Sequence, residues 1–386
     1  MSASAGLDSA IRAVAAIAAE HADDVDRLGR VPEETVQALR SERLMGLLVP
    51  SGFGGPGGTL AEVATVCHAL AQACGASGMI YAMHQIQVAC VVAHGSTSPW
   101  HQALLRQICS AQLLLGSATS EAGTGGNILT SLCAVETVDG QAALAKDAST
   151  ISYGAHADAL LVTARRNATA AANDQVMLVA LRADYTLERT SGWDALGMRG
   201  TCSDGFKFRF SGGAEQVLPA PFGEIAGHTM LPVSHMLWAS VWLGIAGDAV
   251  SRARAWLRQQ VRGRGNVSVM TQRLARAVCL LQLMQGRLSQ ALREYQPVFN
   301  AEPRPVPLGY TADMNNLKTG VSELCLEAVQ HAFMICGINA YRNNSPFSLG
   351  RHVRDLMSAP VMINNDRMLE NTGNLLLMQK PLLGTF

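Results

Sequence analysis

Four long stretches with apolar residues at helical spacing dominate the second half of the sequence. They cover residues 235–260, 267–295, 313–335 and 351–377, and a proline cluster at 303–307 marks one connection between them. A long helix with one apolar stripe must pack that stripe against other elements to remove it from water. Four such helices with short joints predict a four-helix bundle.

Residues 7–110 are also helical in pattern. A proline followed by two acidic residues at 32–34 is typical of a helix start, because proline is tolerated in the first turn and acidic side chains are favoured there. We expect this helix to run to about Met45. The glycine-rich stretch 51–58 must be a loop, and Thr59 is placed to cap the helix that follows it.

Residues 112–220 lose the helical pattern and contain short β-type runs separated by turn signals. The runs lie at 113–115, 159–163, 175–181 and 205–210. They predict a compact antiparallel β domain. The predicted fold is therefore mainly α with a central β domain, divided into residues 1–111, 112–224 and 225–386.

The composition narrows the function classes. Of 386 residues, 48% are hydrophobic and 16% are charged, which suits a large core. The 30 basic and 30 acidic residues cancel, so we expect neither a nucleic-acid partner nor a membrane surface. The nine cysteines form no CxxC pair, and no histidine and acid spacing indicates a metal. We read no signal peptide, and we expect a cytoplasmic protein.

A glycine-rich loop at 120–127, with the sequence SEAGTGGN, follows one of the predicted strands. Glycines allow backbone N–H groups to approach a ligand closely, and Ser120 adds a hydroxyl group. A plain surface loop would have the same composition, so the loop alone does not identify a ligand.

The loop resembles a signature of the acyl-CoA dehydrogenase family, Thr/Ser-Glu-Pro-x-Ala-Gly-Ser-Asp. Five segments in all are similar to family motifs and follow the family's order: 48–55, 120–127, 151–158, 196–201 and 337–355. The resemblance covers nearly the whole chain. It implies N-terminal helices, an antiparallel β barrel-like domain, a C-terminal four-helix bundle and an FAD cofactor.

The same resemblance assigns residues to the flavin. It implies that Ser120 contacts the flavin ring, with Thr119 beside it, and that Ser152 and Ile151 lie next to the ring from another strand. Asn365 matches a further position that approaches the flavin in the family, although a capping role suits it equally. Gly126 replaces a family serine near the substrate, and it supplies no hydroxyl group.

The catalytic base of the family is less easily placed. Many members carry a Glu nine residues after the Arg of an Arg-Asp pair, and counting from Arg354 gives Ile363. A second family location corresponds to about Ser234. Neither is a carboxylate, so Asp366 is our candidate for the base, because it lies about 300° further round a helix from Ile363. The alternative is that Asp366 only pairs with Arg367 or Arg354, or caps a helix.

We therefore predict an FAD-dependent oxidoreductase that carries out α,β-dehydrogenation of an acyl-CoA or acyl-carrier thioester, with an unknown electron acceptor. One alternative is a flavin-dependent monooxygenase on the same fold, and another is a non-catalytic member that binds flavin or acyl-CoA. A monooxygenase site would draw on one of four histidines, His84, His94, His331 and His352. The resemblance also implies a homotetramer or a homodimer.

Overall fold

The computed structural model describes residues 3–264, 268–302 and 307–378. The N-terminal helices are α1 (Ala3–Leu28), α2 (Glu33–Ser41), α3 (Leu60–Ala73), α4 (Gly75–Gly95) and α5 (Pro99–Ala111). The helix expected to reach Met45 ends at Ser41, because Arg43 adopts a left-handed conformation with φ 57°. Thr59 caps α3 as predicted, in a reciprocal capping box with Glu62.

The β domain consists of two small sheets. The first has the order β1 (Leu115–Ala118), β4 (Ala159–Arg165), β5 (Gln175–Leu181), and the second β2 (Glu136–Val138), β3 (Gln141–Ile151), β7 (Asp204–Gly213), β6 (Tyr185–Ser191). Four of the five strand pairs are antiparallel, as predicted, but β1 and β4 pair in parallel. The end of β1 and the end of β3 meet at the start of the glycine-rich loop, because Ser120 binds the backbone of Thr150.

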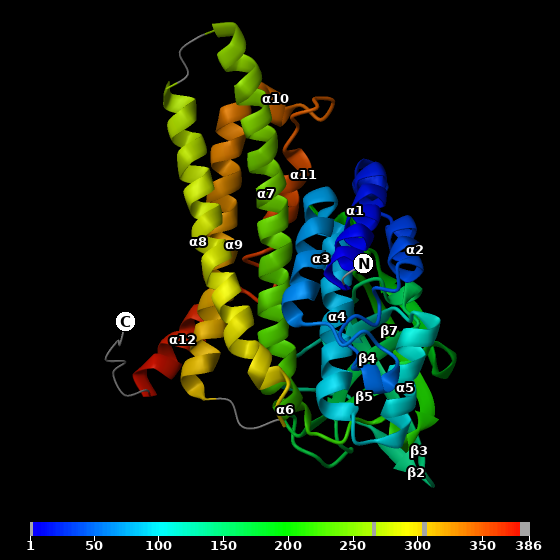
Figure 1. The fold of residues 1–386 in the computed structure, drawn as a ribbon. Coiled ribbons are helices and arrows are strands. Elements are labelled where there is room, and N and C mark those ends of the chain that lie inside the picture. Colours follow the sequence, from blue (N-terminus) through cyan, green and yellow to red (C-terminus); the bar gives the residue numbers. More distant parts are fainter. Residues whose placement is uncertain (1–2, 265–267, 303–306, 379–386) are drawn as a thin grey trace.

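Three long helices form most of the C-terminal part, α7 (Leu231–Arg264), α8 (Ser268–Phe299) and α9 (Leu308–Cys336), and they run side by side (Figure 1). They are preceded by α6 (Phe222–Ile225) and a π-helical turn, η6 (Ala226–Met230). After α9 come the short α10 (Ile338–Tyr341), α11 (Gly350–Leu356) and α12 (Asn365–Met378), and α12 lies across the lower end of the bundle (Figure 1).

The single helix predicted over 351–377 is wrong, because turns at 357–364 separate α11 from α12. Pro360 has no N–H for a helical bond, and Ile363 takes a left-handed conformation with φ 52° that no regular helix accommodates. The order of helices, β unit and helices is confirmed, and so is the fold class.

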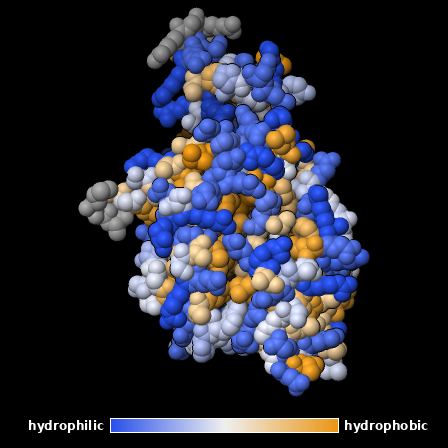
Figure 2. Space-filling view, turned by 90° about the vertical axis from the view of Figure 1, so that its right-hand side faces the viewer, coloured by the Kyte–Doolittle hydropathy of each residue, from blue (hydrophilic) through white to orange (hydrophobic). Residues whose placement is uncertain are grey.

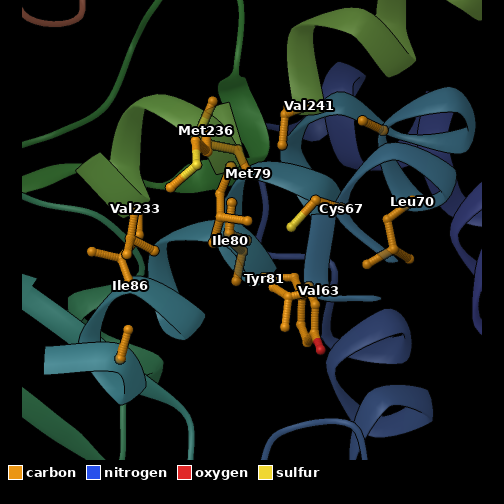
Figure 3. Close-up of a cluster of buried hydrophobic side chains, with 14 of the residues drawn as sticks. Val63, Cys67, Leu70, Met79, Ile80, Tyr81, Ile86, Val233, Met236 and Val241 are labelled. Atoms are coloured by element: carbon orange, nitrogen blue, oxygen red, sulfur yellow. The ribbon is translucent and has the colours of Figure 1, made fainter. Parts of the chain in front are cut away.

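One cluster of buried side chains joins the N-terminal helices to the bundle (Figure 3). Its labelled members come from α3, α4 and α7: Val63, Cys67, Leu70, Met79, Ile80, Tyr81, Ile86, Val233, Met236 and Val241. Burying an aliphatic side chain of this size contributes about 1.5–3 kcal/mol, so this cluster holds the N-terminal helices firmly against α7.

Two helical segments are long and apolar enough to cross a membrane by length and composition, 75–95 and 222–261. In both, 83% of the most apolar window is buried inside the protein, as expected for helices at the centre of a core. The face of the molecule in Figure 2 is mostly hydrophilic, with apolar residues in scattered groups. All nine cysteines are free, and only Cys279 is exposed.

Candidate active site

A cavity of about 590 Å³ is enclosed by four parts of the chain. These are the glycine-rich loop, the first turns of α7, one residue of α9, and α12 with the segment that leads into it. Six apolar side chains form much of its wall: Ile128, Leu129, Leu231, Val361, Ile363 and Met368. Its polar side chains are four amides, one guanidinium and one imidazole: Asn127, Asn315, Asn364, Asn371, Arg367 and His235. Among the described residues that line it, none is a carboxylate. We call this the loop–α12 cavity.

The glycine-rich loop requires its glycines for backbone reasons. Gly123, Gly125 and Gly126 have φ values of 90°, 61° and 75°, a region in which other residues are strained. The carbonyl of Gly125 accepts a hydrogen bond from the Arg367 guanidinium at 3.0 Å, so α12 is fastened directly to the loop. The open glycine tip therefore forms one wall of the cavity.

The acidic residue of the loop, Glu121, is a structural anchor. Its buried carboxylate accepts hydrogen bonds from the backbone N–H groups of Leu132 and Cys133, at 3.1 and 2.7 Å. The buried ammonium of Lys146 lies 3.6 Å from it and donates to the carbonyl of Thr163. Burial lowers the pKa of Lys146, and the nearby Cys133 and Glu121 oppose that effect. These contacts fix the base of the loop against the β domain.

The residues predicted to contact a flavin form two neighbouring groups of hydroxyls. The Ser120 hydroxyl donates to the carbonyl of Thr150 at 2.7 Å and accepts from its N–H at 3.2 Å, which ties the loop to the end of β3. Ile151 is buried at that end, and the Ser152 hydroxyl lies 2.8 Å from the hydroxyl of Ser203.

Thr119, the fourth predicted contact on the β domain, is half-buried, and its hydroxyl lies 3.5 Å from that of Ser117. The hydroxyls of this region both donate and accept, as the polar edge of a flavin ring requires, while the Arg367 guanidinium and the loop N–H groups suit a flavin phosphate. The residues present therefore fit a flavin, and their contact with one stays a prediction.

Asn365, the last of the predicted flavin contacts, begins α12, and its contact with a flavin stays a prediction. Its side chain is buried and accepts a hydrogen bond from the Lys318 ammonium at 2.7 Å, while its amide donates to the Ser322 hydroxyl at 3.0 Å. The same ammonium donates to the carbonyl of Ile363 at 2.6 Å. Burial lowers the pKa of Lys318 to about 8. Asn365 thus helps to hold the left-handed turn at Ile363, and it lies outside the cavity lining.

The candidate base Asp366 lies in the first turn of α12 with an exposed side chain, and it is outside the cavity lining. Ile363 itself forms part of the wall. Ser234, at the second family location, is buried on α7 and carries no carboxylate. The role of Asp366 as a base remains a prediction that its position does not favour.

None of the four histidines named from the sequence is among the residues that line the loop–α12 cavity. The two ring nitrogens of His84 bind the carbonyl of Met45 and the N–H of Leu115, at 2.8 and 3.0 Å. His94 binds the hydroxyl of Thr229 at 2.8 Å, and His352 binds Asp248 at 2.7 Å. The fourth, His331, lies 3.8 Å from Glu327.

His235 is the histidine that sequence reasoning missed. It lies on α7, is only 2% exposed and lines the cavity. Burial lowers the pKa of His235 to about 3; the Lys318 cation acts in the same direction and the Met314 backbone opposes it. The imidazole is therefore neutral near neutral pH. Its place one residue after the counted position Ser234 is the one sequence signal that points to it.

Two of the family-like segments meet away from the cavity. The N–H of Met198 donates to the buried carboxylate of Asp355 at 2.6 Å, and the Arg354 guanidinium binds Asp26 of α1. A Cβ atom on Gly197 would lie 2.1 Å from the carbonyl oxygen of Arg354, so only glycine fits there. The segments 196–201 and 354–355 therefore form a joint between the three parts of the chain.

Comparison with known proteins agrees with this architecture. Residues 4–112 match the family described as acyl-CoA dehydrogenase, N-terminal domain, and residues 236–362 match acyl-CoA dehydrogenase, C-terminal domain. The chain is 27% identical to dibenzothiophene monooxygenase of Rhodococcus erythropolis over 61% of its length, a match that spans 58% of that relative. It is 21% identical to the mitochondrial isovaleryl-CoA dehydrogenase of Solanum tuberosum, over 87% of this chain and 81% of the relative.

A solved structure is similar over almost the whole chain. FMN-bound dibenzothiophene monooxygenase from Paenibacillus sp. A11-2 superimposes with a TM-score of 0.85 at 20% identity, covering 97% of this chain and 98% of the other. At this level of identity the similarity shows a shared fold. It includes both helical parts and the β domain between them.

Proposed function

Because this chain belongs to the acyl-CoA dehydrogenase family, we propose that it is a flavin-dependent monooxygenase that uses the family's flavin-binding fold for oxygenation. The observation that carries the proposal is the loop–α12 cavity, where Ile363 occupies the counted position of the base and the described lining contains no carboxylate. The similarity to dibenzothiophene monooxygenases supports the same choice.

Dehydrogenation of an acyl thioester requires a positioned base, because the α-C–H group is a poor acid. Ile363 has no proton-accepting group, and the side chain of Asp366 is exposed and outside the cavity lining. A monooxygenase does not have to remove a carbon-bound proton from its substrate at this position. The apolar wall around Ile363 is therefore compatible with oxygenation and unfavourable for dehydrogenation.

The chain's own residues would divide the work between the hydroxyl groups near the end of β3, which are outside the cavity lining, and the cavity wall itself. Ser120 and Ser152 would bind the flavin ring, and Arg367 with the glycine-rich loop would hold its phosphate. When bound there, a reduced flavin would supply the two electrons that, with two protons, allow one oxygen atom of dioxygen to enter the substrate and the other to leave as water. The apolar wall excludes bulk water, and His235 offers one neutral hydrogen-bonding group.

The test is isotope incorporation by the purified protein. The chain is loaded with FAD or FMN, since both remain candidates, the flavin is reduced anaerobically, and ¹⁸O-labelled dioxygen is admitted with an aromatic substrate library. We expect labelled oxygen in a product, detected by mass spectrometry. Anaerobic bleaching of the oxidised flavin by acyl-CoA, with formation of an enoyl product, would instead establish the dehydrogenase and overturn the proposal.

The variant Ile363→Glu provides a sharper comparison, with Ile363→Gln as the matched control of nearly equal size. If the missing carboxylate is what separates this chain from dehydrogenases, only the Glu variant gains anaerobic bleaching by acyl-CoA. Wild-type chain that bleaches as fast as the Glu variant would contradict the reasoning.

The predicted homotetramer or homodimer and the cytoplasmic location also remain proposals.

A further inference from the structure

His235 is a buried polar group that the structure leaves unpaired at the edge of a cavity. Its side chain is 2% exposed, and neither ring nitrogen makes a hydrogen bond of good geometry within residues 3–264, 268–302 and 307–378, although the Met314 backbone approaches the ring and acts to raise the pKa of His235. Leaving a buried donor or acceptor without a partner costs free energy, and such groups are rare in folded proteins. An unpaired group beside open volume is the arrangement expected when a ligand supplies the partner.

The neighbours of His235 on α7 show that the cavity makes the difference. Trp238 lies 6.3 Å from the imidazole, centroid to centroid, and Trp242 lies 6.4 Å from Trp238. Both indole N–H groups also have no partner in the described chain, but neither tryptophan lines the loop–α12 cavity. Of these three rings, only that of His235 therefore borders the cavity.

The charges around the imidazole determine which chemical group it suits. Arg367 is the single cation of the described lining, and its guanidinium, which binds the Gly125 carbonyl, is the group proposed above to hold the flavin phosphate, so it would not be free to pair with a charged substrate. The Lys318 ammonium, behind the wall, is held by Ile363 and Asn365. A neutral imidazole offers either a donor or an acceptor toward the cavity, depending on its tautomer.

A hydroxyl group both donates and accepts through one atom, so it pairs with either tautomer. The rest of a bound molecule would contact mostly apolar side chains such as Leu231, Ile363 and Met368. We propose that His235 is a specificity-determining residue that selects an uncharged, largely apolar substrate carrying one hydroxyl group. This inference rests on the proposed function, because it assumes that the cavity receives the molecule to be oxygenated.

The experiment compares three ligands of one shape, p-cresol, toluene and 4-methylbenzoate, by isothermal titration of the flavin-loaded chain at pH 7. We expect wild-type protein to bind p-cresol at least about tenfold more tightly than 4-methylbenzoate. In His235→Leu, the preference for p-cresol over toluene should fall about tenfold, which is the size of one net hydrogen bond to a buried group. His235→Asn, which keeps a neutral donor and acceptor, should retain most of the preference.

His21→Leu is the matched control, since it makes the same substitution at a half-buried histidine of α1 outside the cavity lining and should leave the preference unchanged. An unchanged preference in His235→Leu, or tightest binding of 4-methylbenzoate by the wild type, would overturn the proposal. If the leucine variant fails to fold, the wild-type titration still tests the proposal, because tightest binding of 4-methylbenzoate would contradict it. If the chain yields no labelled product, the proposed function fails separately, because the titration measures binding without turnover.

Discussion

Replacement of Asp355 by Asn should remove a pH dependence of stability that arises at the joint between the domains. The carboxylate is 4% exposed and accepts a hydrogen bond from the Met198 N–H at 2.6 Å. Burial raises the pKa of Asp355 from 3.8 to about 6, although the Met198 N–H and the Arg351 cation act against this. The folded chain therefore binds this proton more tightly than the unfolded chain does.

The sign follows from the direction of the shift. Because the folded pKa is raised, the protonated carboxyl contributes stability that is complete below pH 3.8 and is lost as the pH rises through about 6. A shift of about two units corresponds to about 3 kcal/mol, at about 1.4 kcal/mol per unit. Asp355→Asn stays uncharged and can still accept from Met198, so it should gain about 3 kcal/mol on the wild type between pH 4 and pH 7.

The assay is urea denaturation of both proteins at several pH values from 4 to 7. The free energy of unfolding of the wild type is subtracted from that of Asp355→Asn at each pH, so that the titration of all other groups cancels. Asp366→Asn serves as the control, because this exposed side chain should change the free energy of unfolding by less than about 0.5 kcal/mol at every pH. A difference between wild type and Asp355→Asn that does not vary with pH would refute the reasoning.

Three further substitutions test the packing of the loop, the joint and α3, each by urea denaturation. Gly197→Ala should cost about 3 kcal/mol or more, because its Cβ would lie 2.1 Å from the Arg354 carbonyl oxygen; a cost below 1 kcal/mol would show that the joint can move apart. Lys146→Met should cost about 3–5 kcal/mol, since it leaves the buried Glu121 carboxylate without its cation, and a neutral effect would mean that the backbone N–H groups suffice. Thr59→Ala should cost about 1 kcal/mol by removing the cap of α3, and Thr59→Ser should restore most of it.

The features predicted correctly from the sequence are those that local chemistry decides. Thr59 caps α3 because its hydroxyl and Glu62 satisfy each other's backbone, and both partners can be read from four adjacent residues. The order of helices and strands follows from periodicity in the same way. The parallel pairing of β1 with β4 could not be predicted from local sequence. The two strands lie more than 40 residues apart, and no local rule sets their relative direction.

The candidate site was predicted only in part, because its decisive residues depend on contacts between distant segments. The role of Asn365 is set by Lys318, a residue of another helix whose ammonium also fixes the turn at Ile363. His235 stands out only once the cavity and the missing partners of its ring are seen in three dimensions. A motif read along the chain contains neither kind of information.

The family-like segments divide into two groups with different physical roles, and this division explains why family membership leaves the reaction open. The segments 196–201 and 354–355 bind each other and α1, so they are required for the joint whatever chemistry the protein performs. The loop at 120–127 and the end of β3 form the side of the site that suits a flavin. The position that would distinguish dehydrogenation, Ile363, belongs to neither group and lies in the wall of the loop–α12 cavity, where Lys318 holds only its backbone carbonyl. Its side chain can therefore change from a carboxylate to an alkyl group without disturbing the joint or the loop, so the fold persists while the reaction changes.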